Sequence, residues 1–168
     1  MKFVFSFFTF IFLFSLSGCR SDDSRPVSVD GIVFAYDTLE LRYQQMADLA
    51  IDLMANISVD PGIKVKQLQD LLDREPMVSL DFRKPHTTQN DVITFVNYQQ
   101  KIDNGLKDIF RQLDSAPKWR AAPLILEIRN KYAMLTDSIV IAKAHFNAAV
   151  KDANLGLHIP VDSSAFKK

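Results

Sequence analysis

The chain has 168 residues, of which 20 are basic and 20 acidic, so its formal net charge is zero. This balance argues against a nucleic-acid-binding protein, which gathers basic residues on one face. Cys19 is the only cysteine, so no disulfide can form within the chain. The fold must therefore depend on apolar packing, and the chain is long enough to bury a core as one domain.

The N-terminal segment has the features of a bacterial lipoprotein signal peptide. Lys2 precedes an apolar run over residues 3–16, which is shorter than the ~18 apolar residues of a membrane span. The run ends in Leu16-Ser17-Gly18-Cys19, which resembles a lipobox. We therefore expect residues 1–18 to be removed and Cys19 to be acylated. The alternative is a retained membrane span, and Gly18-Cys19 at the end of the apolar run disfavours it. Two or more acyl chains anchor a protein stably, so the first predicted partner is the membrane.

Residues 19–33 are predicted to be the lipidated cysteine followed by a flexible tether, because residues 20–28 are polar and without periodicity. Ser21-Asp22-Asp23 resembles an export signal for the cell surface in some bacterial lineages, although plain solvation of an acidic tether is the favoured interpretation. Arg20 differs from the aspartate that marks inner-membrane retention in other lineages. The sequence therefore favours the outer membrane over the inner membrane, with surface exposure as a further alternative.

Apolar side chains then recur every three or four residues, which predicts a helix from about Phe34 to Ile57. Its inward residues are Tyr36, Leu39, Tyr43, Met46, Ala50, Leu53 and Ile57. Asp60-Pro61 is typical of a helix start, and it predicts a shorter second helix with Val65, Leu68, Leu71 and Leu72 inward. The loop between Pro76 and Pro85 contains Met77, Leu80 and Phe82, which we expect to pack over the bundle.

Two further helices are expected in the second half of the chain. Thr88-Gln89-Asn90-Asp91 resembles a capping box, and the helix that follows should end before Pro117. The last helix should begin at Ala122-Pro123 and end with Gly156 as its left-handed cap. We expect no strand, so the predicted fold is all-α: an antiparallel bundle of about four helices, the first and last of them long, over residues 34–160. Residues 161–168 would form a C-terminal tail.

The first and last predicted helices resemble those of the LemA family. Ala35-Tyr36 and residues 43–54 follow the family's first-helix motif, in which an aromatic residue, tyrosine, glutamine and two arginines precede Ala-Asp-Leu. Residues 139–154 resemble the last-helix motif, and Ile159-Pro160 lies near the position of its phenylalanine-proline. The resemblance implies a membrane-anchored helical bundle whose biochemical role is unsettled.

The chain departs from the LemA pattern at several positions. Gln45-Met46 replaces the arginine pair, and Ile51 replaces a proline that would kink the first helix. Asp52 replaces an asparagine, while Phe146 and Ala153 replace the two tyrosines of the last-helix motif. A function that relatives perform with those arginines cannot be performed here by the same positions.

No pattern in the sequence indicates catalysis, so we expect a protein that is not an enzyme and has no cofactor. His86, His145 and His158 lie on different predicted elements, which is not the spacing of a metal site. The chain has no HExxH, GxSxG or P-loop motif. Asp48 and Asp52 stand four residues apart on an outward helix face, where solvated carboxylates are the simpler interpretation than a catalytic pair.

Three side chains are candidates for contact with a partner or a ligand. Asn147 and Asn154 are seven residues apart on one helix face, which suits either an amide ladder for a ligand or, as the favoured alternative, interhelical hydrogen bonds and capping. Trp119 lies in the connector between Pro117 and Pro123, where it is either an exposed interface anchor or the cap of a bundle end.

Two functional hypotheses follow. The first is a lipid-anchored, non-enzymatic scaffold or interaction protein of the bacterial envelope, of LemA type, with an unidentified envelope protein as its partner. It predicts an exposed patch, near Trp119 or the 74–87 loop. The second is a binding module that holds a small apolar or cell-wall-derived ligand between helices, with Asn147 or tyrosine hydroxyls as polar contacts. Homo-oligomers are a further alternative, because a spare apolar seam pairs with any partner of matching shape.

Overall fold

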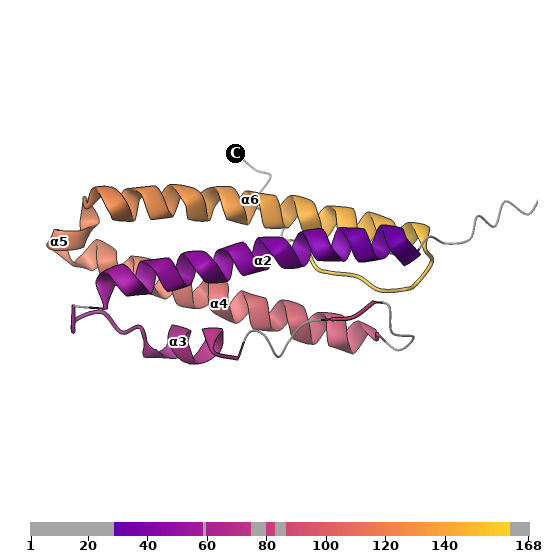
Figure 1. Ribbon diagram of the computed structural model, residues 1–168, viewed down its shortest axis with the longest axis horizontal. Helices are drawn as coiled ribbons and strands as arrows, with labels where there is room; N and C mark the ends of the chain where they lie inside the picture. Colours follow the sequence, from indigo (N-terminus) through magenta and orange to yellow (C-terminus); the bar gives the residue numbers. More distant parts are fainter. Residues whose placement is uncertain (1–28, 59, 75–79, 83–86, 162–168) are drawn as a thin grey trace, which may run out of the picture.

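The structure is a computed structural model, and it describes residues 29–58, 60–74, 80–82 and 87–161. Every regular element in this part of the chain is a helix, as the sequence predicted: α2 (Val29–Ile57), α3 (Lys66–Leu72), α4 (Gln89–Ser115), α5 (Pro117–Arg120) and α6 (Pro123–Asp152) (Figure 1). None of the helices in these ranges is long and apolar enough to span a bilayer. The predicted signal peptide, Cys19, Met77, His86 and the tail beyond residue 161 lie outside the described residues.

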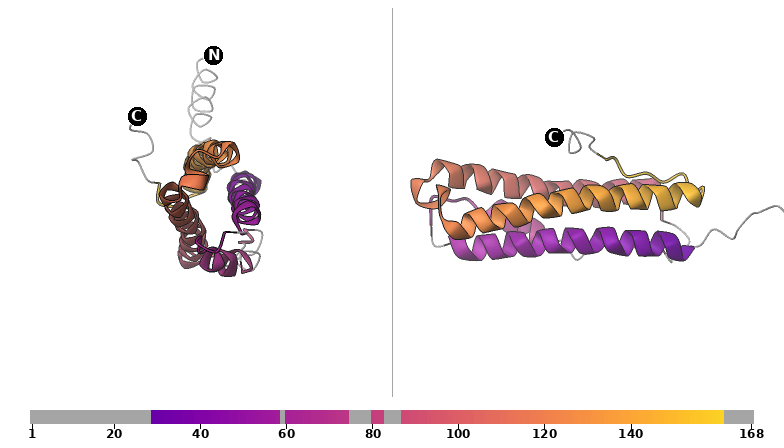
Figure 2. Two further views of the ribbon diagram at one scale, coloured as in Figure 1. Left: turned by 90° about the vertical axis from the view of Figure 1, so that its left-hand side faces the viewer. Right: turned by 90° about the horizontal axis from the view of Figure 1, so that it is seen from above.

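Three long helices form the body of the bundle. α2 and α4 run in the same direction and α6 runs antiparallel to both, while α3 lies beside α2 and α4 (Figures 1 and 2). The short helix α5 turns the chain from α4 into α6 at one end. The sequence predicted two long helices, the first and the last, but α4 has 27 residues against 29 in α2 and 30 in α6. An unbroken apolar stripe from Val92 to Leu113 accounts for its length.

The helix α2 begins at Val29, five residues before the predicted start at Phe34. Ile32 is buried at 2% exposure and lies one turn before Tyr36, so the inward stripe continues toward the N-terminus. The predicted tether over residues 19–33 therefore includes more than a turn of helix at its C-terminal end. Residues 19–28 lie outside the described part of the chain.

The segment after α2 differs from its prediction. Asp60 does not cap a helix at Pro61, because its carboxylate accepts a hydrogen bond from the Gly62 N–H at 3.0 Å within a turn. α3 starts only at Lys66, and it buries Leu68 and Leu72. The prediction of a helix start at Asp60-Pro61 was wrong because an aspartate followed by proline and glycine also suits a tight turn.

The predicted capping box of α4 is confirmed. The Thr88 hydroxyl accepts from the Asp91 N–H, and the Asp91 carboxylate accepts from the Thr88 N–H at 2.8 Å. Farther along the helix, a Cβ at Gly105 would lie 3.0 Å from a methyl group of Leu68. The absence of a side chain at Gly105 therefore lets α3 approach α4 closely.

The C-terminus of α6 has a Schellman motif in which Asn154, rather than the predicted Gly156, is the left-handed cap. Asn154 has φ of 53°, and its N–H donates to the Lys151 carbonyl at 3.0 Å. The Leu155 N–H donates to the Val150 carbonyl at 3.2 Å, which completes the motif. Gly156 also has positive φ, but it lies two residues beyond the cap.

An aromatic cluster fills the core near the start of α2. The Phe82 ring lies 4.8 Å from that of Tyr36 and 5.4 Å from that of Phe146, measured between centroids. The Leu80 N–H donates to the Tyr36 hydroxyl at 2.8 Å. The predicted packing of the loop between Pro76 and Pro85 against the bundle is therefore confirmed for Leu80 and Phe82.

Candidate functional site

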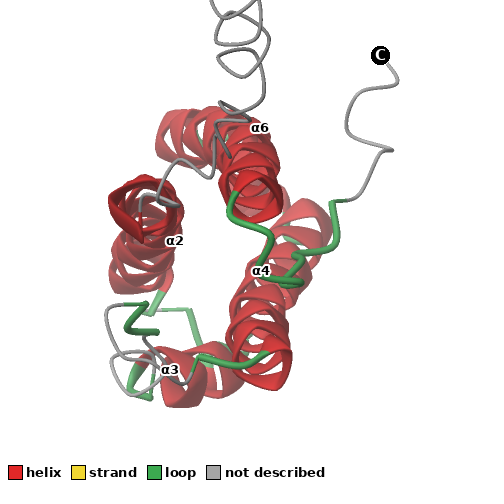
Figure 3. Ribbon diagram, turned by 90° about the vertical axis from the view of Figure 1, so that its right-hand side faces the viewer, coloured by secondary structure: helices red, strands yellow, loops and turns green. Residues whose placement is uncertain are grey.

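The first candidate surface is a groove between α4 and α6. The short helix α5 connects these two helices along the chain, and Figure 3 shows both in a view along the bundle. The volume of the groove is about 480 Å³, within the range of small-ligand sites. Tyr43 and Met46 of α2 line it, together with side chains from α4, α6 and the segment after α6. The residues from those elements are Ile93, Val96, Asn97, Gln99, Gln100, Asp103, Lys107, Thr136, Ile139, Val140, Lys143, Pro160 and Val161. We name this surface the α4–α6 groove.

The polar end of the α4–α6 groove is organised around Asp103. Its carboxylate accepts a hydrogen bond from the Tyr132 hydroxyl at 2.5 Å and forms an ion pair with Lys107 at 2.7 Å. Burial raises the pKa of the Tyr43 hydroxyl, and the nearby Asp103 charge raises it further. The pKa of Tyr132 is also raised, first by burial and then by its bond to Asp103. Both shifts favour the neutral form of these phenols, in which each hydroxyl can donate a hydrogen bond.

Two amide side chains hold the segment after α6, whose Pro160 and Val161 line the α4–α6 groove. The Asn147 amide donates to the Ile159 carbonyl and accepts from the Ile159 N–H, both at 2.7 Å. The Gln89 amide makes the same paired bonds with His158, at 2.9 and 2.8 Å. Since Gln89 belongs to α4 and Asn147 to α6, the segment after α6 bridges the two helices. It thereby places Pro160 against the groove.

Asn147 and Asn154 do not form a shared row of amides for a ligand. Asn147 binds the backbone of the chain's own C-terminal segment, which is neither of the roles predicted for it. Asn154 is the exposed helix cap described above, in agreement with the favoured alternative of capping. The sequence analysis missed Gln89 and Asp103. Gln89 stood within the quoted capping box, but its partner lies 69 residues away.

Trp119 joins two parts of the bundle end. Its indole N–H donates to the Asp60 carboxylate at 2.8 Å, and Lys118 lies over its ring at 4.5 Å from the centroid. The side chain is half-buried and packs against the core. These contacts agree with one of the two predicted roles, the cap of a bundle end, while the role of Trp119 as an interface anchor stays a prediction.

The contact between Trp119 and Asp60 predicts an acid-dependent loss of stability. The Trp119 hydrogen bond, the Gly62 N–H and the Lys118 charge lower the pKa of Asp60 from its ordinary value of 3.8. A lowered pKa stabilises the fold above the unfolded-state pKa, and the stabilisation disappears as the pH falls through the folded-state value. We expect the wild type to be more stable than Asp60→Asn at pH 7, and this difference to vanish well below about pH 4. Urea unfolding followed by tryptophan fluorescence at several pH values measures it, with the exposed Asp70→Asn as the matched control. A difference that is the same at every pH would contradict the prediction.

The described histidines do not form a metal site. His145 is exposed on α6, and His158 is exposed in the following segment. Across the described ranges, no three histidine, cysteine, aspartate or glutamate side chains gather where they could hold a metal ion. A second hollow, of about 510 Å³, lies between α3 and α4. We give it less weight, because the α4–α6 groove contains the buried polar residues Tyr43 and Gln99.

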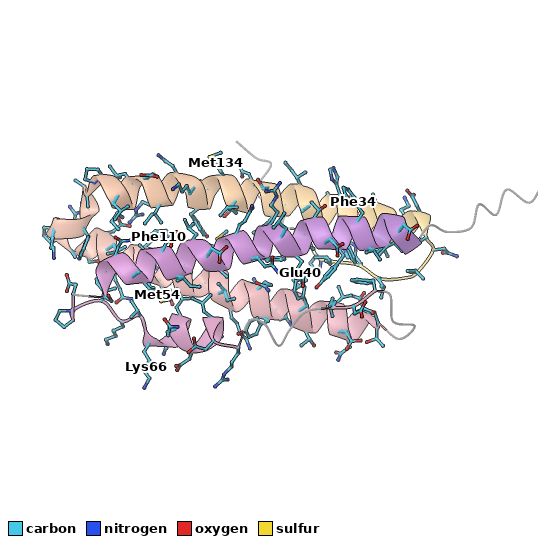
Figure 4. The ribbon with its side chains drawn as sticks, in the orientation of Figure 1. Phe34, Glu40, Met54, Lys66, Phe110 and Met134 are labelled. Carbon is cyan, nitrogen blue, oxygen red and sulfur yellow. The ribbon has the colours of Figure 1, made fainter. Side chains whose placement is uncertain are left out.

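The second candidate surface is apolar and lies across α2 and α6. Phe34 is 75% exposed, Leu41 48%, Met134 71% and Ile141 51%. Figure 4 labels Phe34 on α2 and Met134 on α6. Within each helix the two exposed apolar residues are seven apart, so they point in the same direction. We name this surface the outer face, and it consists of Phe34, Thr38, Leu41 and Gln45 of α2 with Met134, Ser138, Ile141, His145 and Ala148 of α6.

The outer face and the α4–α6 groove lie on opposite sides of α6. Thr136 and Lys143 line the groove. Thr136 comes two positions after Met134 of the outer face, and Lys143 comes two positions after Ile141. Two positions correspond to about 200° around a helix. A partner on the outer face would therefore leave the groove open.

No family model matches the chain, and no curated protein or solved structure matches it either. The LemA resemblance is therefore unsupported by these comparisons and stays a prediction.

Proposed function

We propose that this chain is a lipid-anchored, non-enzymatic interaction protein of the bacterial envelope, of LemA type, attached to the membrane through acylated Cys19 and favouring the outer membrane. The observation that carries the proposal is the outer face, where four large apolar side chains are exposed on two adjacent helices. Exposed apolar patches of this kind mark surfaces that bind another molecule. The patch lies on α2 and α6 rather than near Trp119 or the 74–87 loop, where the sequence had suggested it.

The proposed contact is with an envelope protein. The helix that carries Phe34 begins at Val29, ten residues after Cys19. Ten residues span at most about 35 Å, so a lipidated cysteine would hold the outer face close to the membrane. Tethering raises the effective concentration of a membrane partner at that face, and it allows a modest contact area to suffice.

The second candidate function, a module for a small apolar or cell-wall-derived ligand, is favoured by the α4–α6 groove. The groove combines apolar side chains such as Val96 and Ile139 with the hydroxyl of Tyr43 and the amide of Gln99. A few polar groups among apolar walls are typical of ligand sites. Asn147 was predicted as a ligand contact, but its amide is hydrogen-bonded to the backbone of Ile159.

Site-specific photo-crosslinking in cells separates the two functions. A photoreactive amino acid replaces Leu41 on the outer face, Asn97 at the rim of the groove, or Asp70 on the exposed side of α3 as the control position. We expect a discrete protein adduct from Leu41 only. The adduct should be lost with Ile141→Ser on the neighbouring helix, and it should be reduced with Cys19→Ala, which removes the lipid anchor.

Small-molecule adducts of a few hundred daltons at Asn97, with none at Leu41, would refute the interaction protein and favour the small-ligand module. Equal adducts at Leu41 and Asp70 would show that the outer face has no specific partner, and they would refute the proposal.

A further inference from the structure

The segment after α6 leads into the α4–α6 groove. Gln89 of α4 and Asn147 of α6 hold the backbone of residues 158–159 through two pairs of hydrogen bonds. Pro160 and Val161 come next in the chain, and both line the groove. The segment runs back along the bundle from the end of α6 (Figures 1 and 2), so the chain beyond it starts inside the groove.

The groove extends in the direction in which this segment runs. Gln89 is the first residue of α4, and the α4 residues that line the groove follow it, from Ile93 to Lys107. On the antiparallel helix α6, the lining residues correspondingly come before Asn147. Ile93 and Lys107 are 14 positions apart, or about 21 Å along the helix. Most of the groove therefore lies ahead of the chain where it leaves Val161.

The residues that follow Val161 have a side chain suited to this groove. They are residues 162–168, which we name the tail, and Phe166 is their one aromatic residue. Phe166 comes five positions after Val161, so the chain between them spans at most about 18 Å. This reach is shorter than the groove, and it places Phe166 within the groove when the tail follows it.

The groove offers apolar surface to such a side chain. Ile93 is 40% exposed there, and the buried side chains of Val96, Ile139 and Val140 form part of the same wall. An aromatic ring laid against them removes apolar surface of both partners from water, which is favourable. The volume of about 480 Å³ leaves room for the ring.

Attachment, rather than charge, favours the tail over a separate molecule. Lys143 lines the groove near its entrance, and Asp103 forms its ion pair with Lys107 farther along. The tail has Asp162 at its start and lysines at 167–168, so charges of both signs occur on both partners. A segment joined to its site by a short linker has an effective concentration on the order of millimolar, which allows a weak contact to form.

We infer that the tail occupies the α4–α6 groove of its own chain, with Phe166 against the wall that contains Ile93. The tail is then an intramolecular competitor for any small ligand of the groove. Such a ligand has to displace the tail, and its apparent affinity falls with the fraction of molecules in which the groove is open. The inference goes beyond the proposed interaction function, which uses the outer face on the opposite side of α6.

Photo-crosslinking from the tail tests the inference on the purified full chain, as the cell processes it. A photoreactive amino acid replaces Phe166, and mass spectrometry maps the crosslinked peptides. We expect crosslinks to the groove-lining parts of α4 and α6. In a mixture of isotopically labelled and unlabelled protein, each crosslink should join peptides of the same isotope. Ile93→Ser should reduce the yield severalfold, while Leu126→Ser, an exposed apolar position outside the groove, should leave it unchanged.

Binding of an apolar fluorescent dye provides a second measurement. Phe166→Ser should increase dye binding, because the tail no longer competes for the groove, and adding Ile93→Ser should remove the increase. Dye binding that Phe166→Ser leaves unchanged would overturn the inference.

Two other crosslinking results would also overturn it. Crosslinks from position 166 to the outer face, or to no part of the bundle, would show that the tail does not occupy the groove. Crosslinks between labelled and unlabelled chains would assign the groove to the tail of a second copy. None of these results depends on the adducts at Leu41 that test the proposed function, so the two can fail separately.

Discussion

Replacing Phe146 by alanine is expected to lower the free energy of unfolding by about 3–5 kcal/mol. The side chain is fully buried, and its ring centroid lies 6.4 Å from that of Tyr36 and 5.4 Å from that of Phe82. Truncation removes these contacts and leaves a cavity where α2, α6 and the segment around Leu80 meet. Urea unfolding monitored by circular dichroism measures the change.

The neighbouring His145→Ala is the matched control, because His145 is exposed on the same helix turn. We expect it to change stability by no more than about 0.5 kcal/mol. A loss at Phe146 of similar size to that at His145 would show that the aromatic cluster does not stabilise the bundle.

Replacing Asn147 by leucine is expected to lower the free energy of unfolding by about 2–4 kcal/mol. The substitution leaves the N–H and the carbonyl of Ile159 without their partners, although Ile159 is only 1% exposed. Backbone polar groups that are buried without partners are costly, so we expect the segment after α6 to leave its site. The measurements are urea unfolding and the rate of amide hydrogen exchange at Ile159.

Asn154→Gly provides the comparison for Asn147→Leu, because it removes the other amide of the predicted ladder. Glycine adopts the left-handed cap conformation without strain, so we expect a change of no more than about 0.5 kcal/mol. If both substitutions cost the same, the paired bonds of Asn147 would not be what secures the C-terminal segment.

The helices and their inward faces were predictable because both depend on local spacing. The stripe from Tyr36 to Ile57 and the capping box at Thr88 involve residues within a few positions of one another, and the structure confirms them. Local signals were weaker where one residue suits two conformations. Asp60 forms a turn instead of a helix cap, and Asn154 takes the cap that was assigned to Gly156.

The candidate surfaces were less predictable than the helices. Periodicity marks Leu41 and Ile141 as outward residues, but it does not say that α2 and α6 are adjacent, which is what joins them in one face. The α4–α6 groove likewise depends on how α4 and α6 are placed relative to each other, and this placement has no signature in the sequence.

The sequence by itself determined the all-α class, the faces that each helix buries, and the cap of α4, because these follow from interactions within one or two helix turns. Only the tertiary structure decided which polar groups far apart in the sequence bind each other. Trp119 reaches Asp60 across 59 positions, and Gln89 reaches His158 across 69. Such pairs form because packing of the apolar faces brings distant segments together, and polar groups then bond to whatever partner lies within reach.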